Sequence, residues 1–287
     1  MLLIISQNMT ICIGALCSNE HNICDTVIVA SDRMVTLGGF MEFEHDSPKI
    51  TKITTNCMAL IAGDALRGAK LVEELKSKVT DADDLKKIVQ EASNAYVVCR
   101  DKQIDADIFK PRGFSKSEFY LTYQQKLLPQ LSAQLDQFTV QFNYNVEMLI
   151  AGVDDSGGHI YTIVNPGGSP IHFNQLGYHA IGSGGIHAIQ SLIGFKHSIG
   201  KKVEDTLFYV YASKRRAEVA PGVGKETDIY IIKRDNIIKV SEIDLQKLES
   251  IYTTYSHPLE NTVFEEVKKI SIFTTNATTE TTTTGAN

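Results

Sequence analysis

The stretch Met9-Thr10-Ile11-Cys12-Ile13-Gly14 opens an apolar run, residues 10–17, that has the length and composition of a buried β-strand. A second apolar run, residues 26–31, follows after a polar turn, and a third, residues 57–62, ends at Gly63. Short apolar runs separated by polar turns are typical of antiparallel sheet. The sequence therefore predicts that antiparallel strands form the first part of the domain.

After Gly63 the apolar residues repeat at helical spacing. This pattern predicts two helices, one from Ala65 to Val79 and one beginning near Leu85, which pack side by side. Residues 101–115 are polar and contain a proline and a glycine, so they predict an inserted loop before a helix at residues 116–134. The same signals predict strands at 147–153, 159–164 and 170–174, a helix after Gly182-Ser183-Gly184-Gly185, a helix over Val203–Arg216, and a closing hairpin over Asp228–Lys233 and Ile237–Val240.

Two sheets with helix pairs on their outer faces predict an α+β fold, a four-layer αββα sandwich in one domain over residues 10–240. Beyond it, residues 241–271 predict a helical extension with helices at 242–254 and 259–269, which would cover an edge or a neighbouring subunit. Residues 272–287 are rich in threonine and predict a disordered tail, because they have little apolar surface to bury.

Composition narrows the class of protein. The 287 residues are 43% hydrophobic and carry a net charge of −6 with scattered basic residues, which gives no footprint for nucleic acid. No apolar run has the length of a membrane span, and five cysteines without paired metal-ligand spacing are typical of a reduced cytoplasmic protein. The eight histidines are dispersed, and His45 beside Glu42, Glu44 and Asp46 is interpreted as part of a polar hairpin. We therefore expect no metal and no cofactor.

Thr10 is also a candidate nucleophile. A threonine that becomes an amino terminus carries its own base, because the α-amino group titrates at about 8 and lies within reach of the hydroxyl. Asp32 in Ser31-Asp32-Arg33 and Lys49 in Pro48-Lys49-Ile50 follow at strand and hairpin spacing. A lysine near the hydroxyl favours its ionisation, and an aspartate orients that lysine. Each residue alone also fits an ordinary strand or surface role, so it is their joint register that points to an amide-cleaving enzyme.

In the order and spacing of these motifs the chain resembles the proteasome β-type branch of the N-terminal nucleophile (Ntn) hydrolases, over roughly residues 10–240. Within that branch it looks most like the bacterial and archaeal proteasome-like proteins. The resemblance implies that Thr10 is the nucleophile, Asp32 the catalytic acid and Lys49 the catalytic lysine. It further implies a threonine endopeptidase without a cofactor.

Three other positions match the family's catalytic network. Gly63 falls on the glycine whose backbone N–H stabilises the oxyanion, and Ser183 falls on the serine that hydrogen-bonds the terminal amine. Glu218 aligns with the family's second acid. Two positions depart from the family pattern, because Met9 stands where self-processing subunits have glycine and Pro221 stands where the family has a serine.

The resemblance also implies how a substrate would bind. Thr36 would pair its backbone with an extended peptide, as an added strand does. Six positions would line the pocket next to the scissile bond: Val35, Ser47, Thr51, Ile61, Ala65 and Ala69. None of the six carries a formal charge, so we expect cleavage after leucine-like or other apolar residues.

Two questions stay open at the level of sequence. Residues 1–9 are either a propeptide or a mis-assigned start, in which case removal of Met9 would expose Thr10. The chain is either a threonine peptidase or amidase acting on a peptide or protein, or a catalytically silent proteasome-like scaffold in which Thr10 stays internal. In both cases the resemblance implies a homo-oligomer, a ring or a stack, and it leaves any ATP-dependent unfoldase partner unidentified.

Overall fold

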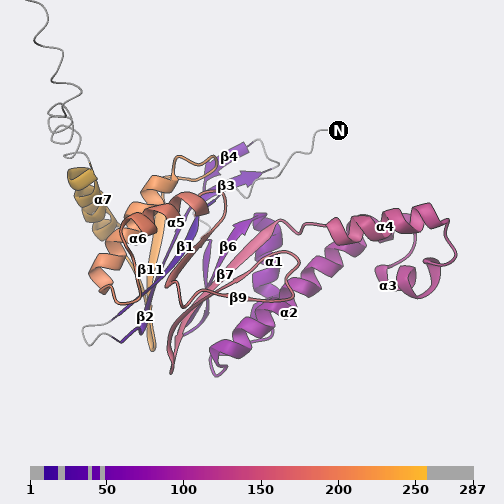
Figure 1. The fold of residues 1–287 in the computed structure, drawn as a ribbon, viewed down its shortest axis with the longest axis horizontal. Coiled ribbons are helices and arrows are strands. Elements are labelled where there is room, and N and C mark those ends of the chain that lie inside the picture. Colours follow the sequence, from indigo (N-terminus) through magenta and orange to yellow (C-terminus); the bar gives the residue numbers. More distant parts are fainter. Residues whose placement is uncertain (1–9, 19–22, 38–40, 46–48, 257–287) are drawn as a thin grey trace, which may run out of the picture. The chain divides into compact units, whose positions relative to one another are not determined.

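The computed structural model describes residues 10–18, 23–37, 41–45 and 49–256. The chain divides into two compact units, the first ending at Val240 and the second beginning at Ser241. The first unit combines helices with antiparallel sheets (Figure 1), a content that agrees with the predicted α+β class. Within the described residues, no helix combines the length and the apolar composition that crossing a membrane requires.

The first sheet contains the strands nearest to Thr10. Its five strands pair antiparallel. Every residue of the two neighbouring strands that follow Thr10 in the chain, Cys12–Cys17 and Thr26–Asp32, is buried, which explains why most of their residues are apolar. In spatial order the strands are β10 (Tyr178–Ile181), β1 (Cys12–Cys17), β2 (Thr26–Asp32), β11 (Thr227–Lys233) and β12 (Asn236–Lys239).

The second sheet also has five antiparallel strands. The predicted strand at 170–174 is shorter than expected, because only two residues pair there. A separate two-stranded ribbon, β3 (Met34–Leu37) with β4 (Met41–Glu44), follows β2. In spatial order the second sheet contains β5 (Ile50–Thr54), β6 (Cys57–Gly63), β7 (Val146–Asp154), β8 (Gly157–Ile163) and β9 (Ile171–His172).

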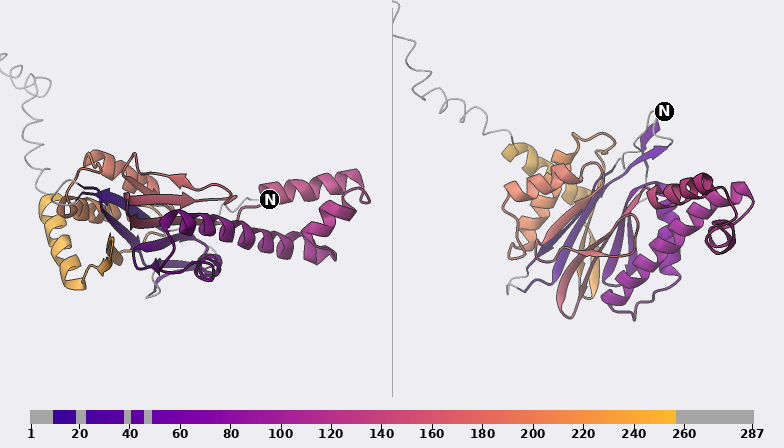
Figure 2. Two further views of the ribbon diagram at one scale, coloured as in Figure 1. Left: turned by 90° about the horizontal axis from the view of Figure 1, so that it is seen from below. Right: turned by 45° about the vertical axis from the view of Figure 1, so that its right-hand side comes forward.

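The two sheets face each other across a buried apolar core (Figure 2). Leu16 and Val29 of the first sheet pack there with Leu60, Leu149 and Ile160 of the second. All five side chains are almost fully buried, so this layer contributes most of the hydrophobic stabilisation between the sheets. The sheets therefore hold their strand ends in fixed relative positions.

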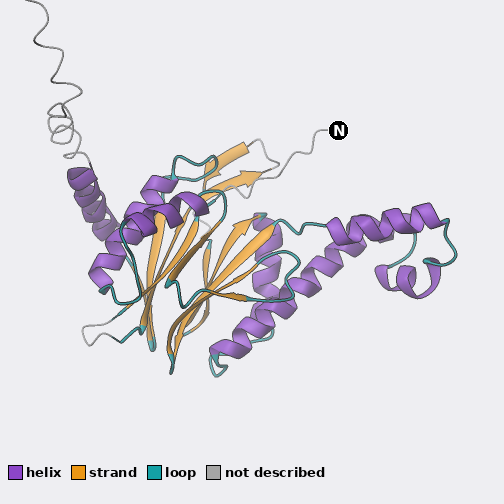
Figure 3. Cartoon of the chain, viewed as in Figure 1, coloured by secondary structure: helices purple, strands orange, loops and turns teal. Residues whose placement is uncertain are grey.

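Helices contact the outer face of each sheet (Figure 3). On the second sheet, Leu71 and Leu75 of α1 (Ala65–Lys76) and Ile88 and Ala92 of α2 (Leu85–Ile104) pack with Ile150 of β7. On the first sheet, α6 (Val203–Ala217) contacts β1 and β2, and α5 (Gly185–Gly194) contacts β10. The helices predicted from Ala65, from near Leu85, after Gly185 and over Val203–Arg216 are therefore present.

The predicted loop at 101–115 is wrong. The chain stays helical through Ile104, continues as a π-helix, η1 (Asp105–Phe109), and then as a 3-10 turn, η2 (Lys110–Arg112). Ile104 and Phe109 keep it folded, because they are buried in a small separate core with Phe119 and Leu135. The helical path ends at Gly113, whose φ of 86° is in the left-handed region that glycine tolerates.

The single predicted helix at 116–134 is also wrong. The structure has a short helix, α3 (Lys116–Glu118), a π-helix, η3 (Phe119–Tyr123), and a new helix, α4 (Pro129–Gln141). Pro129 is the cause, because a proline is accepted at the first position of a helix but not in its interior. These helices extend away from the two sheets (Figure 1).

The second unit contains α7 (Glu242–Ser256), which confirms the helix predicted at 242–254. Its start is capped by Ser241, whose hydroxyl accepts a hydrogen bond from the Asp244 N–H at 3.2 Å. The second predicted helix, 259–269, and the predicted tail, 272–287, lie outside the described residues.

Candidate active site

Thr10, Asp32 and Lys49 come together at the ends of strands from both sheets. Thr10 lies two residues before β1, and its hydroxyl donates to Asp32 Oδ1 at 2.6 Å. The ammonium of Lys49, immediately before β5, donates to the same Thr10 oxygen and to Asp32 Oδ1, the latter at 2.7 Å. Asp32 is fully buried and Lys49 is 14% exposed, so the attraction between the two charges is screened less than it would be at the surface.

The carboxylate of Asp32 is fixed by backbone donors as well. Its Oδ1 also accepts from the Ile11 N–H at 3.1 Å. Its Oδ2 accepts from the N–H groups of Met34 at 3.2 Å and Gly224 at 2.8 Å. These contacts hold the aspartate in one orientation, so the position of Lys49 against the threonine hydroxyl is fixed in turn.

Gly63 lies at the turn from β6 to α1, with a φ of 106° that a side chain would make unfavourable. Along β6 the Ile61 N–H donates to the Lys49 carbonyl at 3.1 Å, whereas the Asp64 N–H donates to Asn145 on the opposite side. Because N–H groups two residues apart on a strand point to the same side, the Gly63 N–H points toward the side of Lys49. It is therefore available as an oxyanion donor.

Ser183 contacts the backbone nitrogen of Thr10. The Thr10 N–H donates to Ser183 Oγ at 3.2 Å, and Ser183 Oγ donates to the carbonyl of Pro221 at 3.1 Å. The preceding residue, Gly182, has a φ of 87° and passes so close to the Thr10 carbonyl that a side chain would collide with it. The Gly182 N–H is in turn bound by Glu147 Oε2 at 2.9 Å.

Glu218 lies at the C-terminal end of α6, and its carboxylate binds two neighbouring cations. Lys214 Nζ donates to Glu218 Oε1 at 2.7 Å, and the guanidinium of Arg215 donates to both carboxylate oxygens at 2.7 and 2.8 Å. The structure thus places Glu218 beside these two side chains, whereas Asp32, Lys49 and Ser183 each contact Thr10.

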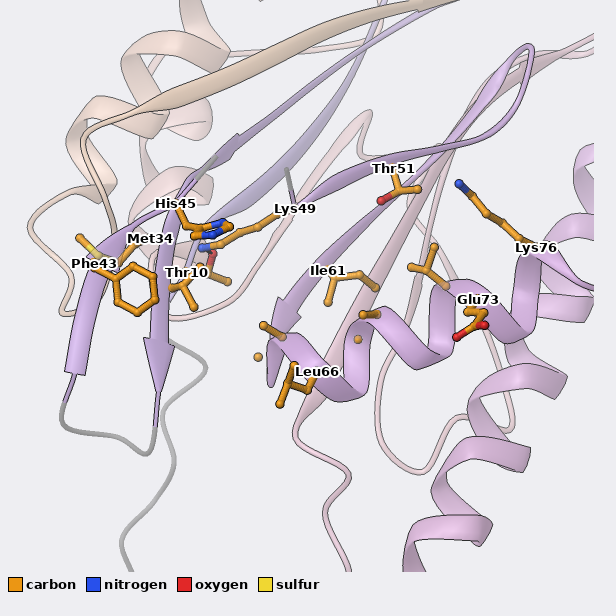
Figure 4. A pocket seen from close by; sticks show the side chains of 16 residues that line it. Thr10, Met34, Phe43, His45, Lys49, Thr51, Ile61, Leu66, Glu73 and Lys76 are labelled. Carbon is orange, nitrogen blue, oxygen red and sulfur yellow. Dashed lines mark hydrogen bonds between the residues drawn. The ribbon is translucent and has the colours of Figure 1, made fainter. Parts of the chain in front are cut away.

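A cavity of about 570 Å³ opens beside Thr10 (Figure 4). In Figure 4, Thr10 and Lys49 lie at one end of it, and Thr51, Glu73 and Lys76 lie toward the other. Of the predicted pocket residues, those that line the cavity are Val35, Thr51, Ile61, Ala65 and Ala69, and Gly63 lines it as well.

Two other predicted substrate-binding positions, the peptide-pairing Thr36 and the pocket residue Ser47, are not among the described residues that line the cavity. Thr36 pairs with Glu42 in the β3–β4 ribbon, next to the cavity residue Val35. Ser47 lies outside the described residues. The cavity wall also contains residues that sequence reasoning missed, Met34 and Phe43 among them, because the pattern gave no sign that this ribbon folds toward Thr10.

His45 lines the same cavity. Over the residues that the structure describes, no group of three or more histidine, cysteine, aspartate or glutamate side chains is arranged to hold a metal ion. Cys12, two residues after Thr10, donates its thiol hydrogen to the Ile61 carbonyl at 3.4 Å. Burial raises the pKa of the Cys12 thiol, which disfavours the reactive thiolate, so Thr10 is the better candidate nucleophile.

Gly224 and Glu147 were also missed by sequence reasoning. Gly224 forms one hydrogen bond with Asp32, which lies 192 positions away in the sequence. Glu147 forms one hydrogen bond with Gly182, which lies 35 positions away and is the neighbour of Ser183. No local sequence signal identifies such partners.

Comparison of the chain with protein-family models and with curated proteins finds no match.

Proposed function

We propose that this protein is a threonine peptidase or amidase of the Ntn hydrolase type, with the four-layer αββα sandwich of that fold. The observation that carries the proposal is the convergence of the Thr10 hydroxyl, the Asp32 carboxylate and the Lys49 ammonium at the end of an apolar cavity. A hydroxyl that contacts both a partly buried ammonium and a fixed carboxylate is the setting that an activated oxygen nucleophile requires.

The proposed reaction needs Thr10 as the amino terminus. Its α-amine then lies where the Thr10 nitrogen contacts Ser183 Oγ, and it accepts the hydroxyl proton as Oγ1 attacks the substrate carbonyl. The Lys49 ammonium stabilises the charge that develops on Oγ1, and the Gly63 N–H stabilises the oxyanion. Collapse releases the amine product, which takes up the proton, and water then hydrolyses the threonine ester.

The cavity favours a substrate with an apolar side chain next to the scissile bond. Val35, Ile61 and Ala69 give it apolar walls near Thr10, so burial of a medium-sized hydrocarbon side chain contributes binding free energy. An unpaired charge in the same place would be penalised. We further propose that the substrate is an extended peptide bound along Thr36 of β3, and that the protein acts in the cytoplasm as a homo-oligomer.

A silent scaffold explains the buried charges less well. Replacing a buried ion pair by apolar side chains is often neutral or stabilising, so a chain under selection for packing alone gains little from Lys49 and Asp32. In this chain the pair also binds a hydroxyl that faces a cavity. This combination favours the enzyme.

The test compares the full chain with a chain whose first residue is Thr10, both verified by intact mass. We expect hydrolysis of fluorogenic peptides only from material that starts at Thr10, with retention in Thr10→Ser and loss in Thr10→Ala. An active preparation that still starts at Met1 would refute the mechanism. Absence of hydrolysis by verified Thr10-terminal protein, over a peptide panel, would favour the scaffold.

A further inference from the structure

The segment that follows α6 contacts two of the proposed site residues. This segment, residues 218–226, is called the 218–226 loop and joins α6 to β11. The Gly224 N–H donates to Asp32 Oδ2 at 2.8 Å, and the Pro221 carbonyl accepts from Ser183 Oγ at 3.1 Å. One loop therefore holds a carboxylate and a hydroxyl that each contact the proposed nucleophile.

Lys214 of α6 holds this loop from inside the protein. Its side chain is fully buried, and its ammonium donates to Glu218 Oε1 at 2.7 Å and to the Lys225 carbonyl at 2.6 Å. These partners lie near the two ends of the loop. Burial lowers the pKa of Lys214, and the nearby carboxylates of Glu218 and Asp32 oppose that effect. A buried ammonium is costly to desolvate, so packing alone does not account for a lysine here.

Glu44 at the end of β4 holds the loop from its exposed side. Its Oε1 accepts from the N–H groups of Lys225 at 2.7 Å and Glu226 at 3.2 Å. The approach is so close that a side chain at Gly224 would collide with the Glu44 carboxylate. The last residues of the loop are therefore fixed by two side chains from different elements, and Gly224 lies between these contacts and Asp32.

We propose that Lys214 and Glu44 are positioning residues for the reaction: they fix the 218–226 loop, and the loop fixes Asp32 and Ser183. The inference rests on the proposed function. It also gives Glu218 a role, because that carboxylate is the partner that pairs with the buried ammonium. These residues act through the loop and not on the substrate, so their loss should lower kcat and leave KM close to its original value.

The experiment uses the full chain processed to Thr10 and three variants. Lys214→Met keeps the side-chain length and removes the ammonium, and Glu44→Ala removes the acceptor at an exposed position. Lys87→Met is the control for loss of a lysine ion pair. Lys87 of α2 pairs at 2.6 Å with Asp83, four residues away, and Lys214 of α6 pairs in the same way with Glu218. Peptide hydrolysis gives kcat and KM, and hydrogen–deuterium exchange over residues 218–226 reports on the loop.

We expect kcat to fall about 10- to 100-fold in Lys214→Met, with KM changed less than about twofold and faster exchange in the loop. Glu44→Ala should also lower kcat, by a smaller factor than Lys214→Met does. Lys87→Met should have the kcat of the wild type. If Lys214→Met does not fold, Glu44→Ala decides, because its side chain is exposed.

If the folded variants keep the wild-type kcat, with or without faster exchange in the loop, the inference is wrong. Peptide hydrolysis by the wild type would still support the proposed function in that case. An inactive wild type with a verified Thr10 terminus would overturn the proposed function, and this inference with it.

Discussion

Replacing Asp32 by asparagine keeps the shape of the side chain and removes the charge that pairs with Lys49. The carboxylate accepts five hydrogen bonds, three on Oδ1 and two on Oδ2. An amide has one oxygen, so its NH2 group must face donors on one side. With the amide oxygen kept toward Lys49, the N–H groups of Met34 and Gly224 lose their acceptor.

The magnitude follows from these contacts. A buried donor without an acceptor costs about 1–3 kcal/mol, and removing one partner of a buried ion pair costs about 3–5 kcal/mol. The terms overlap because they act on one side chain, so we expect Asp32→Asn to lower the free energy of unfolding by about 3–5 kcal/mol. We also expect a fall in kcat/KM of at least about 100-fold, equivalent to about 3 kcal/mol of transition-state stabilisation.

The assay is peptide hydrolysis by protein with a verified Thr10 terminus, together with urea unfolding. Asp228→Asn is the matched control, because Asp228 is 2% exposed and binds Arg33 at 2.8 Å and Lys239 at 2.9 Å without lining the cavity. The control should lose stability and keep turnover within a few-fold. If Asp32→Asn loses no more activity than Asp228→Asn, the assignment of Asp32 to the site is refuted.

Three further predictions concern pH, the cavity and the oxyanion donor. Burial lowers the pKa of His179 to about 4, whereas a histidine in the unfolded chain has a pKa of about 6.5. Between these two pH values the unfolded chain binds more protons than the folded chain. The free energy of unfolding should therefore be at its full value above pH 6.5 and fall as the pH is lowered toward 4. The free energy of urea unfolding should differ less between pH 7 and pH 5 in His179→Phe than in the wild type. An equal difference in the two proteins would contradict this prediction. Ala69→Phe fills the cavity, so KM for leucine peptides should rise at least about tenfold while alanine peptides are less affected; a uniform change would exclude Ala69 from the pocket. Gly63→Ala, at a φ of 106°, should lower stability by about 1–2 kcal/mol and kcat by about 10- to 100-fold; unchanged kcat in a peptide assay would remove its N–H from the reaction.

Much of the fold was predictable because it depends on local signals. The buried strand β1 is a continuous apolar run, β2 is apolar over residues 27–30, and α1 repeats its apolar residues at helical spacing. Asp64, whose carboxylate accepts from the N–H groups of Leu66 and Arg67, marks the start of that helix in the sequence. These features need no knowledge of distant residues.

The helices beyond Ile104 were not predictable in the same way. Residues 101–115 are polar enough to indicate a loop, yet Ile108 and Phe109 are buried against Phe119 and Leu135. Only tertiary contact makes those few apolar side chains sufficient to keep the segment helical. Tertiary structure also decides which residues Glu218 contacts, so the sequence alone could not show that it binds Lys214 and not Thr10.

The sequence predicted that Thr10, Asp32 and Lys49 lie together, but not what holds them in place. Asp32 ends β2 of the first sheet and Thr10 precedes β1 of that sheet, whereas Lys49 precedes β5 and Gly63 ends β6 of the second sheet. The contact between Lys49 and Thr10 therefore depends on how the two sheets pack, and not on either sheet alone. At Gly14 the sheets are so close that an added Cβ atom would lie 3.3 Å from side-chain atoms of both Leu149 and Ile160. The two sheets are therefore tightly packed at this point.

This arrangement explains why the motifs appear as separate short segments. A nucleophile and its lysine on opposite sheets are fixed by the whole buried layer between the sheets, which is close-packed and resists small displacements. The cavity beside Thr10 is lined by the β3–β4 ribbon, by residues of β5 and β6, and by α1. The same packing that stabilises the fold thus sets the distance between the proposed reacting groups, and side chains that never touch a substrate, such as those of the 218–226 loop, set their orientation.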